Sequence, residues 1–175
     1  MRLADTPWGR LGLTVCYDMR FPYLYRALAK AGAKIIAVPA AFTRPTGEAH
    51  WEVLLRARAI ETGAFVIAPA QGGAHEDGRA TWGHSLVVAP WGEVIALADH
   101  DEPCALVAEL DLAAVAKARA AIPALVNERP FTGPVLIPET VAVVRSAASG
   151  GALSGRRVRG RGWSRRLRSQ WSCDR

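Results

Sequence analysis

The chain has 175 residues, half of them hydrophobic, which is enough for one globular domain with a sizeable core. Its formal net charge of +6 arises at the C-terminal end, because residues 145–175 hold nine arginines and one acid while the remainder has a net charge of −2. No apolar run approaches the roughly 20 residues that span a bilayer, and the N-terminal residues lack the apolar stretch of a signal peptide. Three widely spaced cysteines, Cys16, Cys104 and Cys173, argue against a disulfide framework and favour a reducing, cytoplasmic setting.

The first predicted elements are a strand, a sharp turn and a helix around a cysteine. The apolar run at 11–15 is typical of a short buried strand, and it ends on Cys16. Asp18 and Pro22 provide turn and helix-start chemistry, and the spacing of apolar residues then predicts a helix to Ala31. A thiol at such a junction lies near backbone N–H groups and a helix N-terminus, which favour the thiolate and bind an oxyanion. Cys16 is therefore a candidate nucleophile, and a small buried side chain at a strand end is the alternative.

A parallel sheet is predicted to continue after this helix. A strand at 34–39 would complete a strand–helix–strand unit, which forms a right-handed crossover between parallel strands. The loop at 40–47 follows the carboxyl end of that strand, where ligands bind in such sheets. Residues 48–62 predict a helix with apolar side chains on two faces, which is typical of a helix buried between layers. A third strand is predicted at 64–70.

The following region is predicted to add antiparallel strands. The loop at 71–83 is long and polar, and loops of this length are often functional. Further strands are predicted at 84–89, 93–98 and 104–110, and a helix at 112–121. The turn at 90–92 indicates a hairpin between the first two of these strands. Cys104 is expected to face the core, and Asp111 is a good N-cap for the last helix. Crossovers followed by hairpins indicate an α/β fold with a mixed sheet covered by helices.

Composition divides the chain into three parts. We expect a globular domain at 1–130, a linker at 131–155 and an Arg-rich tail at 156–175 that is disordered on its own. The arginines of the tail, with Trp163 and Trp171 between them, could bind nucleic acid through phosphate contacts and stacking. A solvated extension with non-specific affinity for polyanions is the favoured interpretation.

Four blocks of the sequence resemble the nitrilase, or carbon–nitrogen hydrolase, superfamily. The block at 9–22, GRLGLTVCYDMRFP, is similar to the nucleophile motif of that family. The block at 49–61 resembles the long helix of its Nit branch, and those at 83–85 and 90–94 resemble its late strands. The resemblance covers about residues 5–130, and within the branch it is greatest for the deaminated glutathione amidases.

The resemblance implies part of an α-β-β-α sandwich and a glutamate–lysine–cysteine triad that needs no cofactor. In that family the cysteine attacks the carbon of an amide or nitrile to form a thioester, the glutamate is the general base and the lysine stabilises the oxyanion. Carried over to this chain, Cys16 is the nucleophile and the Tyr17 backbone N–H is an oxyanion donor, while Arg20, Phe42 and Thr43 line the substrate side. The implied substrate is a small linear amide resembling deaminated glutathione. The implied full-length parent is a cytoplasmic homo-oligomer with no membrane association.

The chain departs from the family pattern on both sides of these blocks. The glutamate and lysine of the family precede the cysteine, but residues 1–15 contain only one acid, Asp5, and the first lysine is Lys30. Tyr23 occupies a position where the family has an acidic residue, and the tail at 156–175 has no counterpart there. We therefore expect a truncated or mis-started form of a Nit-type amidase, with an impaired site, one uncovered sheet face and a tail read out of frame.

Other functions have weaker support from the sequence. The four histidines lack the spacing of metal ligands, so no metal site is predicted, and His50 and His84 are expected to pack or to form hydrogen bonds. Glu52 and Glu61 do not share a helix face, so they are interpreted as surface or supporting carboxylates, with Arg56 as a partner for Glu52. A non-catalytic fragment or dimerising scaffold is a further alternative, as is nucleic-acid binding by the tail.

Overall fold

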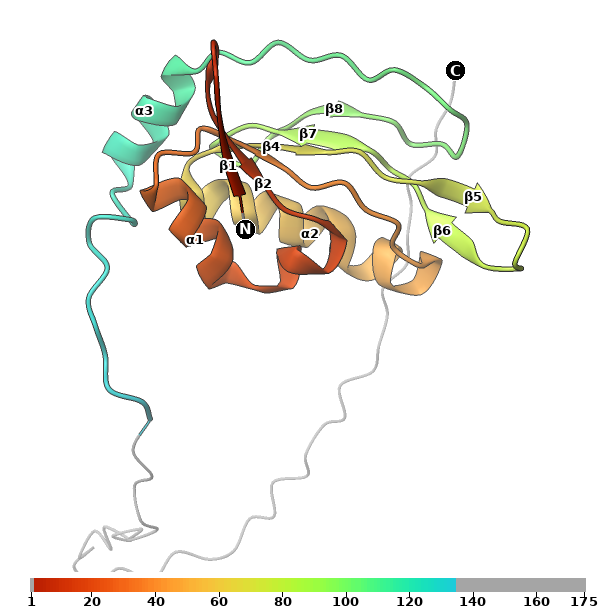
Figure 1. The fold of residues 1–175 in the computed structure, drawn as a ribbon, viewed down its shortest axis with the longest axis horizontal. Helices are drawn as coiled ribbons and strands as arrows, with labels where there is room; N and C mark the ends of the chain where they lie inside the picture. Colours follow the sequence, from red (N-terminus) through yellow and green to blue (C-terminus); the bar gives the residue numbers. More distant parts are fainter. Residues whose placement is uncertain (1, 135–175) are drawn as a thin grey trace, which may run out of the picture. The chain divides into compact units, whose positions relative to one another are not determined.

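The computed structural model describes residues 2–134, which form a mixed α/β structure (Figure 1). Residues 135–155 of the predicted linker and the tail at 156–175 lie outside the described residues. The elements are β1 Arg2–Thr6, β2 Gly9–Leu13, the 3-10 helix η1 Cys16–Arg20, α1 Pro22–Lys30, β3 Ile35–Ala37, α2 Arg44–Thr62, β4 Phe65–Ala68, β5 Gly72–Ala74, β6 Ala80–Trp82, β7 Leu86–Val88, β8 Val94–Leu97 and α3 Ala113–Ala121. None of the helices within residues 2–134 is both long and apolar enough to cross a bilayer.

Six strands form one sheet in the order β1-β2-β3-β4-β7-β8. Strands β2, β3 and β4 pair in parallel, whereas β1 with β2, β4 with β7 and β7 with β8 pair antiparallel. Gly12 of β2 is opposite Ile36 of β3, which is opposite Val66 of β4. The predicted crossovers, the predicted hairpin and the mixed sheet are therefore confirmed.

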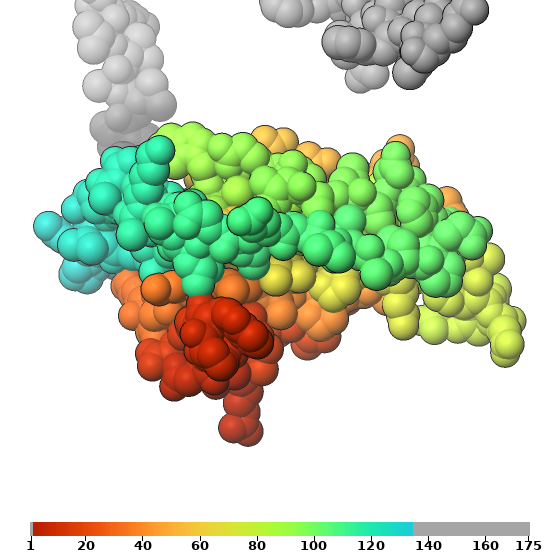
Figure 2. Space-filling model, turned by 90° about the horizontal axis from the view of Figure 1, so that it is seen from above, coloured from red at the N-terminus to blue at the C-terminus, as the bar shows by residue number. Residues whose placement is uncertain are grey.

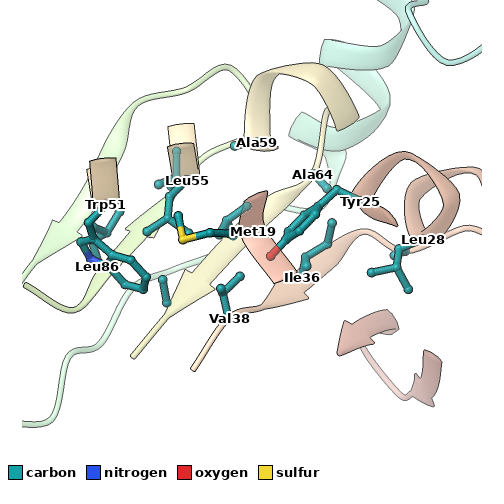
Figure 3. Close-up of a cluster of buried hydrophobic side chains, with 14 of the residues drawn as sticks. Met19, Tyr25, Leu28, Ile36, Val38, Trp51, Leu55, Ala59, Ala64 and Leu86 are labelled. Atoms are coloured by element: carbon teal, nitrogen blue, oxygen red, sulfur yellow. The ribbon is translucent and has the colours of Figure 1, made fainter. Parts of the chain in front are cut away.

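The core lies between the sheet and helices α1 and α2, which cover one of its faces (Figures 1 and 3). The strands contribute aliphatic side chains and the helices contribute larger ones. The largest fully buried members are Trp51, Tyr25, Met19, Leu28, Ile36, Leu55, Leu86, Val38, Val66 and Val88. Because Met19 belongs to this cluster, the turn that follows Cys16 is anchored directly in the core.

Helix α2 differs in two respects from the prediction at 48–62. It begins at Arg44, because Pro45 occupies its first turn, where a proline has no N–H to lose. Its apolar residues are also buried on one face only: Val53 is 68% exposed and Ile60 is 53% exposed. The prediction of a helix buried between two layers was wrong, since these two side chains remain largely exposed.

The opposite face of the sheet is crossed by the segment at 99–112, which runs to α3 (Figures 1 and 2). The strand predicted at 104–110 is absent, because this segment is extended but has no ladder partner among the described residues. Cys104 is exposed, so the expectation that it faces the core was also wrong. Leu13 of β2 is 41% exposed and Val15, just after this strand, is 58% exposed, which confirms that part of this face is uncovered.

The predicted loop at 71–83 contains the hairpin β5–β6, which packs on the start of α2. Gly47 permits this contact, because a β-carbon at that position would lie 2.2 Å from Cβ of Trp82. Trp82 has little room to move. Its backbone N–H donates to the Phe42 carbonyl oxygen (2.8 Å), and its ring stacks on that of His84 with 4.1 Å between the ring centres. The contact between the hairpin and helix α2 therefore requires glycine at position 47.

Replacing Gly47 by alanine is expected to lower the free energy of unfolding by about 2 kcal/mol, because overpacking outweighs the gain in helix propensity. Urea unfolding followed by circular dichroism measures the change. Gly133→Ala is the matched control, since a β-carbon there would meet no atom within 4 Å. Equal stabilities of the two variants would contradict the packing account.

Tyr25 is a fully buried titratable group beneath the sheet (Figure 3). Its hydroxyl lies 2.9 Å from Oγ1 of Thr14, and the Thr14 hydroxyl donates to the Ala37 carbonyl oxygen at 2.8 Å. The Tyr25 hydroxyl is therefore the donor in its bond to Thr14. Burial raises the pKa of Tyr25 from its ordinary value of 10.0 to about 12.

This pKa predicts alkaline sensitivity. Between pH 10 and 12 the folded chain holds the Tyr25 proton more tightly than the unfolded chain does, so stability present below pH 10 is lost as the pH rises toward 12. The slope contributed by one such group approaches about 1.4 kcal/mol per pH unit. Tyr25→Phe is expected to flatten this part of the curve in urea unfolding at stepped pH. Parallel curves for the two proteins would refute the assignment.

Candidate active site

Cys16 lies at the junction of β2 and η1, where its backbone φ is 44°. A left-handed conformation of a residue with a β-carbon costs on the order of 1–3 kcal/mol, so neighbouring contacts must hold it. The Cys16 N–H donates to the Pro39 carbonyl oxygen (2.8 Å), and the Thr14 N–H donates to the Ala37 carbonyl oxygen (3.1 Å). The half-buried thiol residue packs against the core on one side and lines a hollow on the other. The position of Cys16 is therefore compatible with both interpretations of the sequence, a nucleophile and a small packed side chain at a strand end.

The hollow beside Cys16 has a volume of about 810 Å³. Three of its walls follow the carboxyl ends of the parallel strands: Val15 and Cys16 follow β2, residues 39–41 follow β3, and residues 69–71 follow β4. A hollow at this edge of a sheet is the usual position of a ligand site. The prediction of a ligand-facing loop after the second predicted strand agrees with this geometry.

The turn after Cys16 is fixed by a reciprocal pair of hydrogen bonds. The Val15 N–H donates to Oδ2 of Asp18 (3.0 Å), and the Asp18 N–H donates to the Val15 carbonyl oxygen (2.9 Å). The Tyr17 N–H, which lies between them, donates to no other residue within 2–134. It is therefore available to an oxygen atom of a ligand.

Of the predicted site residues only Cys16 lines the hollow, because Tyr17, Arg20, Phe42 and Thr43 lie outside its wall. The Arg20 guanidinium lies 5.2 Å from the ring centre of Phe42 and 5.4 Å from that of Tyr17. Its Nη2 lies 3.4 Å from Nδ1 of His50, and no carboxylate within the described residues forms an ion pair with it. Phe42 is buried, whereas the exposed Thr43 bonds Oγ1 of Thr46 at 2.9 Å. The structure thus leaves the Arg20 charge uncompensated beside two aromatic rings.

Sequence reasoning missed most of the remaining wall of the hollow, which is formed by Ser85 and residues of the segment 98–104. His75 also lines this wall, and it belongs to the loop at 71–83 whose length indicated a function. Asp101 in this segment pairs with Nη2 of Arg44 at 2.6 Å. The Ser85 hydroxyl oxygen accepts the Ala70 N–H at 2.8 Å. The run of His, Asp, Glu and Cys within 100–104 was a signal that this segment faces a polar site.

The supporting roles expected of other polar residues are confirmed. Nδ1 of His84 lies 2.6 Å from the Trp82 carbonyl oxygen, and Nη1 of Arg56 lies 3.2 Å from Oε1 of Glu52. No cluster of three or more His, Cys, Asp or Glu side chains that could hold a metal ion occurs within residues 2–134.

The structure places a strained cysteine between a parallel strand and a short helix, beside a hollow at the strand ends, which is a geometry compatible with nucleophilic chemistry. Residues 1–120 match the model of the carbon–nitrogen hydrolase family, and the chain belongs to that family. It is 53% identical over 127 residues to the deaminated glutathione amidase of Homo sapiens, covering 73% of this chain and 38% of the relative. The chain thus spans less than half the length of this relative.

Solved structures show the same fold. The C. elegans NitFhit protein is similar with a TM-score of 0.67 and 47% identity, over 74% of this chain and 31% of that one. An amidase from Nesterenkonia, solved with the acetamide moiety of fluoroacetamide bound covalently at its active site cysteine, is similar with a TM-score of 0.57 and 34% identity. That match covers 69% of this chain and 44% of the amidase. The predicted family and branch are confirmed.

Asp18→Ala is expected to lower the free energy of unfolding by about 1 kcal/mol, because the Val15 N–H then loses its acceptor. Asp18→Asn keeps a side-chain oxygen and is expected to lose much less. Asp5→Ala is the matched control, since its ion pair with Arg10 is exposed and contributes little. Urea unfolding measures all three, and equal losses for Asp18→Ala and Asp5→Ala would contradict the role of the turn.

Proposed function

We propose that this chain carries the nucleophile half of an amidase site, in which Cys16 forms a thioester with a small linear amide. The observation that carries the proposal is the position of Cys16, half-buried at a strained turn and facing a hollow at the carboxyl ends of three parallel strands. The covalent adduct at the active site cysteine of the Nesterenkonia amidase supports the assignment of this residue type as nucleophile.

The reaction has two stages. The Cys16 sulfur attacks the amide carbon, and the carbonyl electron pair moves to oxygen to form a tetrahedral oxyanion. The unpartnered Tyr17 N–H is the proposed donor to this oxyanion. Collapse of the intermediate expels ammonia or an amine, whose nitrogen takes up the proton that the Cys16 thiol gave up on attack, and leaves a thioester. Water then attacks the thioester to release a carboxylic acid and the free thiol.

Arg20, Phe42 and Thr43 are proposed to recognise the substrate beyond the scissile bond. The Arg20 guanidinium lies against the aromatic rings of Phe42 and Tyr17 with no carboxylate partner among the described residues. A planar guanidinium in such a setting suits a carboxylate. The substrate class is therefore an amide that also carries a carboxylate, as a deaminated-glutathione-like molecule does.

The proposed chemistry needs a general base and a cation for the oxyanion. The resemblance implies a glutamate and a lysine upstream of the nucleophile, and residues 1–15 contain neither. We therefore expect slow turnover by this chain, with covalent addition at Cys16 as the measurable first stage. Homo-oligomerisation and polyanion binding by the tail at 156–175 stay predictions.

Incubation with fluoroacetamide tests the proposal, with adducts located by peptide mass spectrometry. We expect addition at Cys16 to exceed that at exposed Cys104 at least about tenfold, because placement of the reacting groups dominates such rates. Cys16→Ser should abolish the fast adduct, whereas Cys173→Ser should leave it unchanged. Equal labelling of Cys16 and Cys104 would refute the assignment of Cys16. Robust Cys16-dependent hydrolysis would instead refute the expectation of an impaired site.

A further inference from the structure

Arg58 is the only charged residue that is buried within residues 2–134, with 6% of its surface exposed. Burying a cation is costly unless it is paired and fully hydrogen-bonded. Its Nη1 donates to Oε1 of Glu61 at 2.8 Å, and its Nε donates to the Met19 carbonyl oxygen at 2.8 Å. The guanidinium therefore links helix α2 to the turn that contains the candidate nucleophile.

The acceptor of the second bond lies three residues after Cys16. Met19 is in η1, and its side chain is fully buried in the core (Figure 3). The Arg58 bond therefore fixes the backbone of η1 at the point where the Met19 side chain already holds it. The Asp18 carboxylate holds the start of the same turn through the Val15 N–H.

Arg58 also acts on the chain before Cys16. Its guanidinium carbon lies 5.6 Å from the ring centre of Tyr25, and the Tyr25 hydroxyl bonds Oγ1 of Thr14 at 2.9 Å. Thr14 in turn bonds the Ala37 carbonyl oxygen of β3 through both its hydroxyl (2.8 Å) and its N–H (3.1 Å). The strained Cys16 is thus bracketed by two connections that meet at one side chain.

We infer that Arg58 is a positioning residue for Cys16, holding η1 and Tyr25 so that the nucleophile keeps its left-handed conformation. Glu61 orients the guanidinium from the next turn of α2. The inference rests on the proposed function of Cys16 as a nucleophile. Without the contacts of Arg58 to Met19 and Tyr25, the backbone at Cys16 would leave its left-handed conformation. The thiol and the Tyr17 N–H would then no longer be held around one reaction centre.

The electrostatic environment of Glu61 agrees with a close and stable ion pair between Arg58 and Glu61. Burial raises the pKa of Glu61, while the Arg58 charge and hydrogen bond act in the opposite direction. Arg56, two residues earlier on the same helix, has the same pattern of bonds, to Glu52 and to the Gly92 carbonyl oxygen, but it is half-exposed and neither bond reaches η1. Arg56 therefore provides a matched control.

The test is addition of acrylamide to the full chain, with the rates at Cys16 and Cys104 measured by mass spectrometry in the same sample. Acrylamide forms an enolate oxygen as sulfur adds, so its rate reports on the oxyanion donor as well as on the thiol. In Arg58→Met the ratio of the Cys16 rate to the Cys104 rate is expected to fall about tenfold. Arg58→Lys restores part of the ratio, because an ammonium can still reach the Met19 carbonyl oxygen, and Arg56→Met leaves it unchanged.

An unchanged ratio in folded Arg58→Met would overturn the positioning role, as would an equal fall in Arg56→Met. A ratio near one in the unaltered chain would refute the proposed nucleophile itself. Glu61→Gln provides a second route should Arg58→Met fail to fold. We expect it to speed hydrogen exchange at the amides of η1 without a matching change in β3 and β4, and no local change would overturn the inference.

Discussion

The backbone of Cys16 is the constraint on which the site depends. A φ of 44° is unfavourable for a residue with a side chain, so the native fold must hold it against the preference of the isolated turn. The hydrogen bond to Pro39 fixes it to the adjacent parallel strand, and the buried Met19 side chain fixes the following helix. Strain of this kind persists only where the surroundings are rigid, and here they are the centre of the core.

Much of this arrangement could be predicted from sequence because its signals are local. The apolar run before Cys16, the proline at the start of α1 and the next apolar run together specify a parallel crossover. Parallel pairing then places the chain after each strand at one edge, which is where the hollow lies. The mixed sheet and the place of Cys16 at a strand end therefore followed from short-range patterns, whereas its role as a nucleophile rests on the family motif and stays a prediction.

The predictions that were wrong concern segments whose structure depends on which other part of the chain they pack against. Residues 104–110 have the apolar content of a strand, but a strand also needs a free edge beside it, and this segment crosses a sheet face instead. Cys104 is exposed for the same reason. The hairpin β5–β6 has Gly72 and Gly73 in place of an alternating apolar pattern, so its sequence was indistinguishable from a loop.

The burial of Arg58 could have been predicted from its position in the sequence. It occurs at helical spacing from the buried Trp51, Leu55 and Thr62, so its position placed a charge within the apolar stripe of α2. A charge there must either find buried partners or destabilise the fold. Its partners, Met19 and Glu61, were not evident from spacing, because one is a main-chain carbonyl reached only after the crossover has formed.

The two sides of the hollow therefore differ in what determines their geometry. The side that bears Cys16 is set by main-chain hydrogen bonds, by core packing of the buried Met19 and by the buried Arg58 cation. The facing segment at 98–104 is held by an exposed ion pair between Arg44 and Asp101, which salt screens and which contributes little stability. Rigidity is concentrated at the attacking atom, where small displacements cost most in rate. The facing wall, which would contact the rest of a substrate, is free to vary without disturbing the nucleophile.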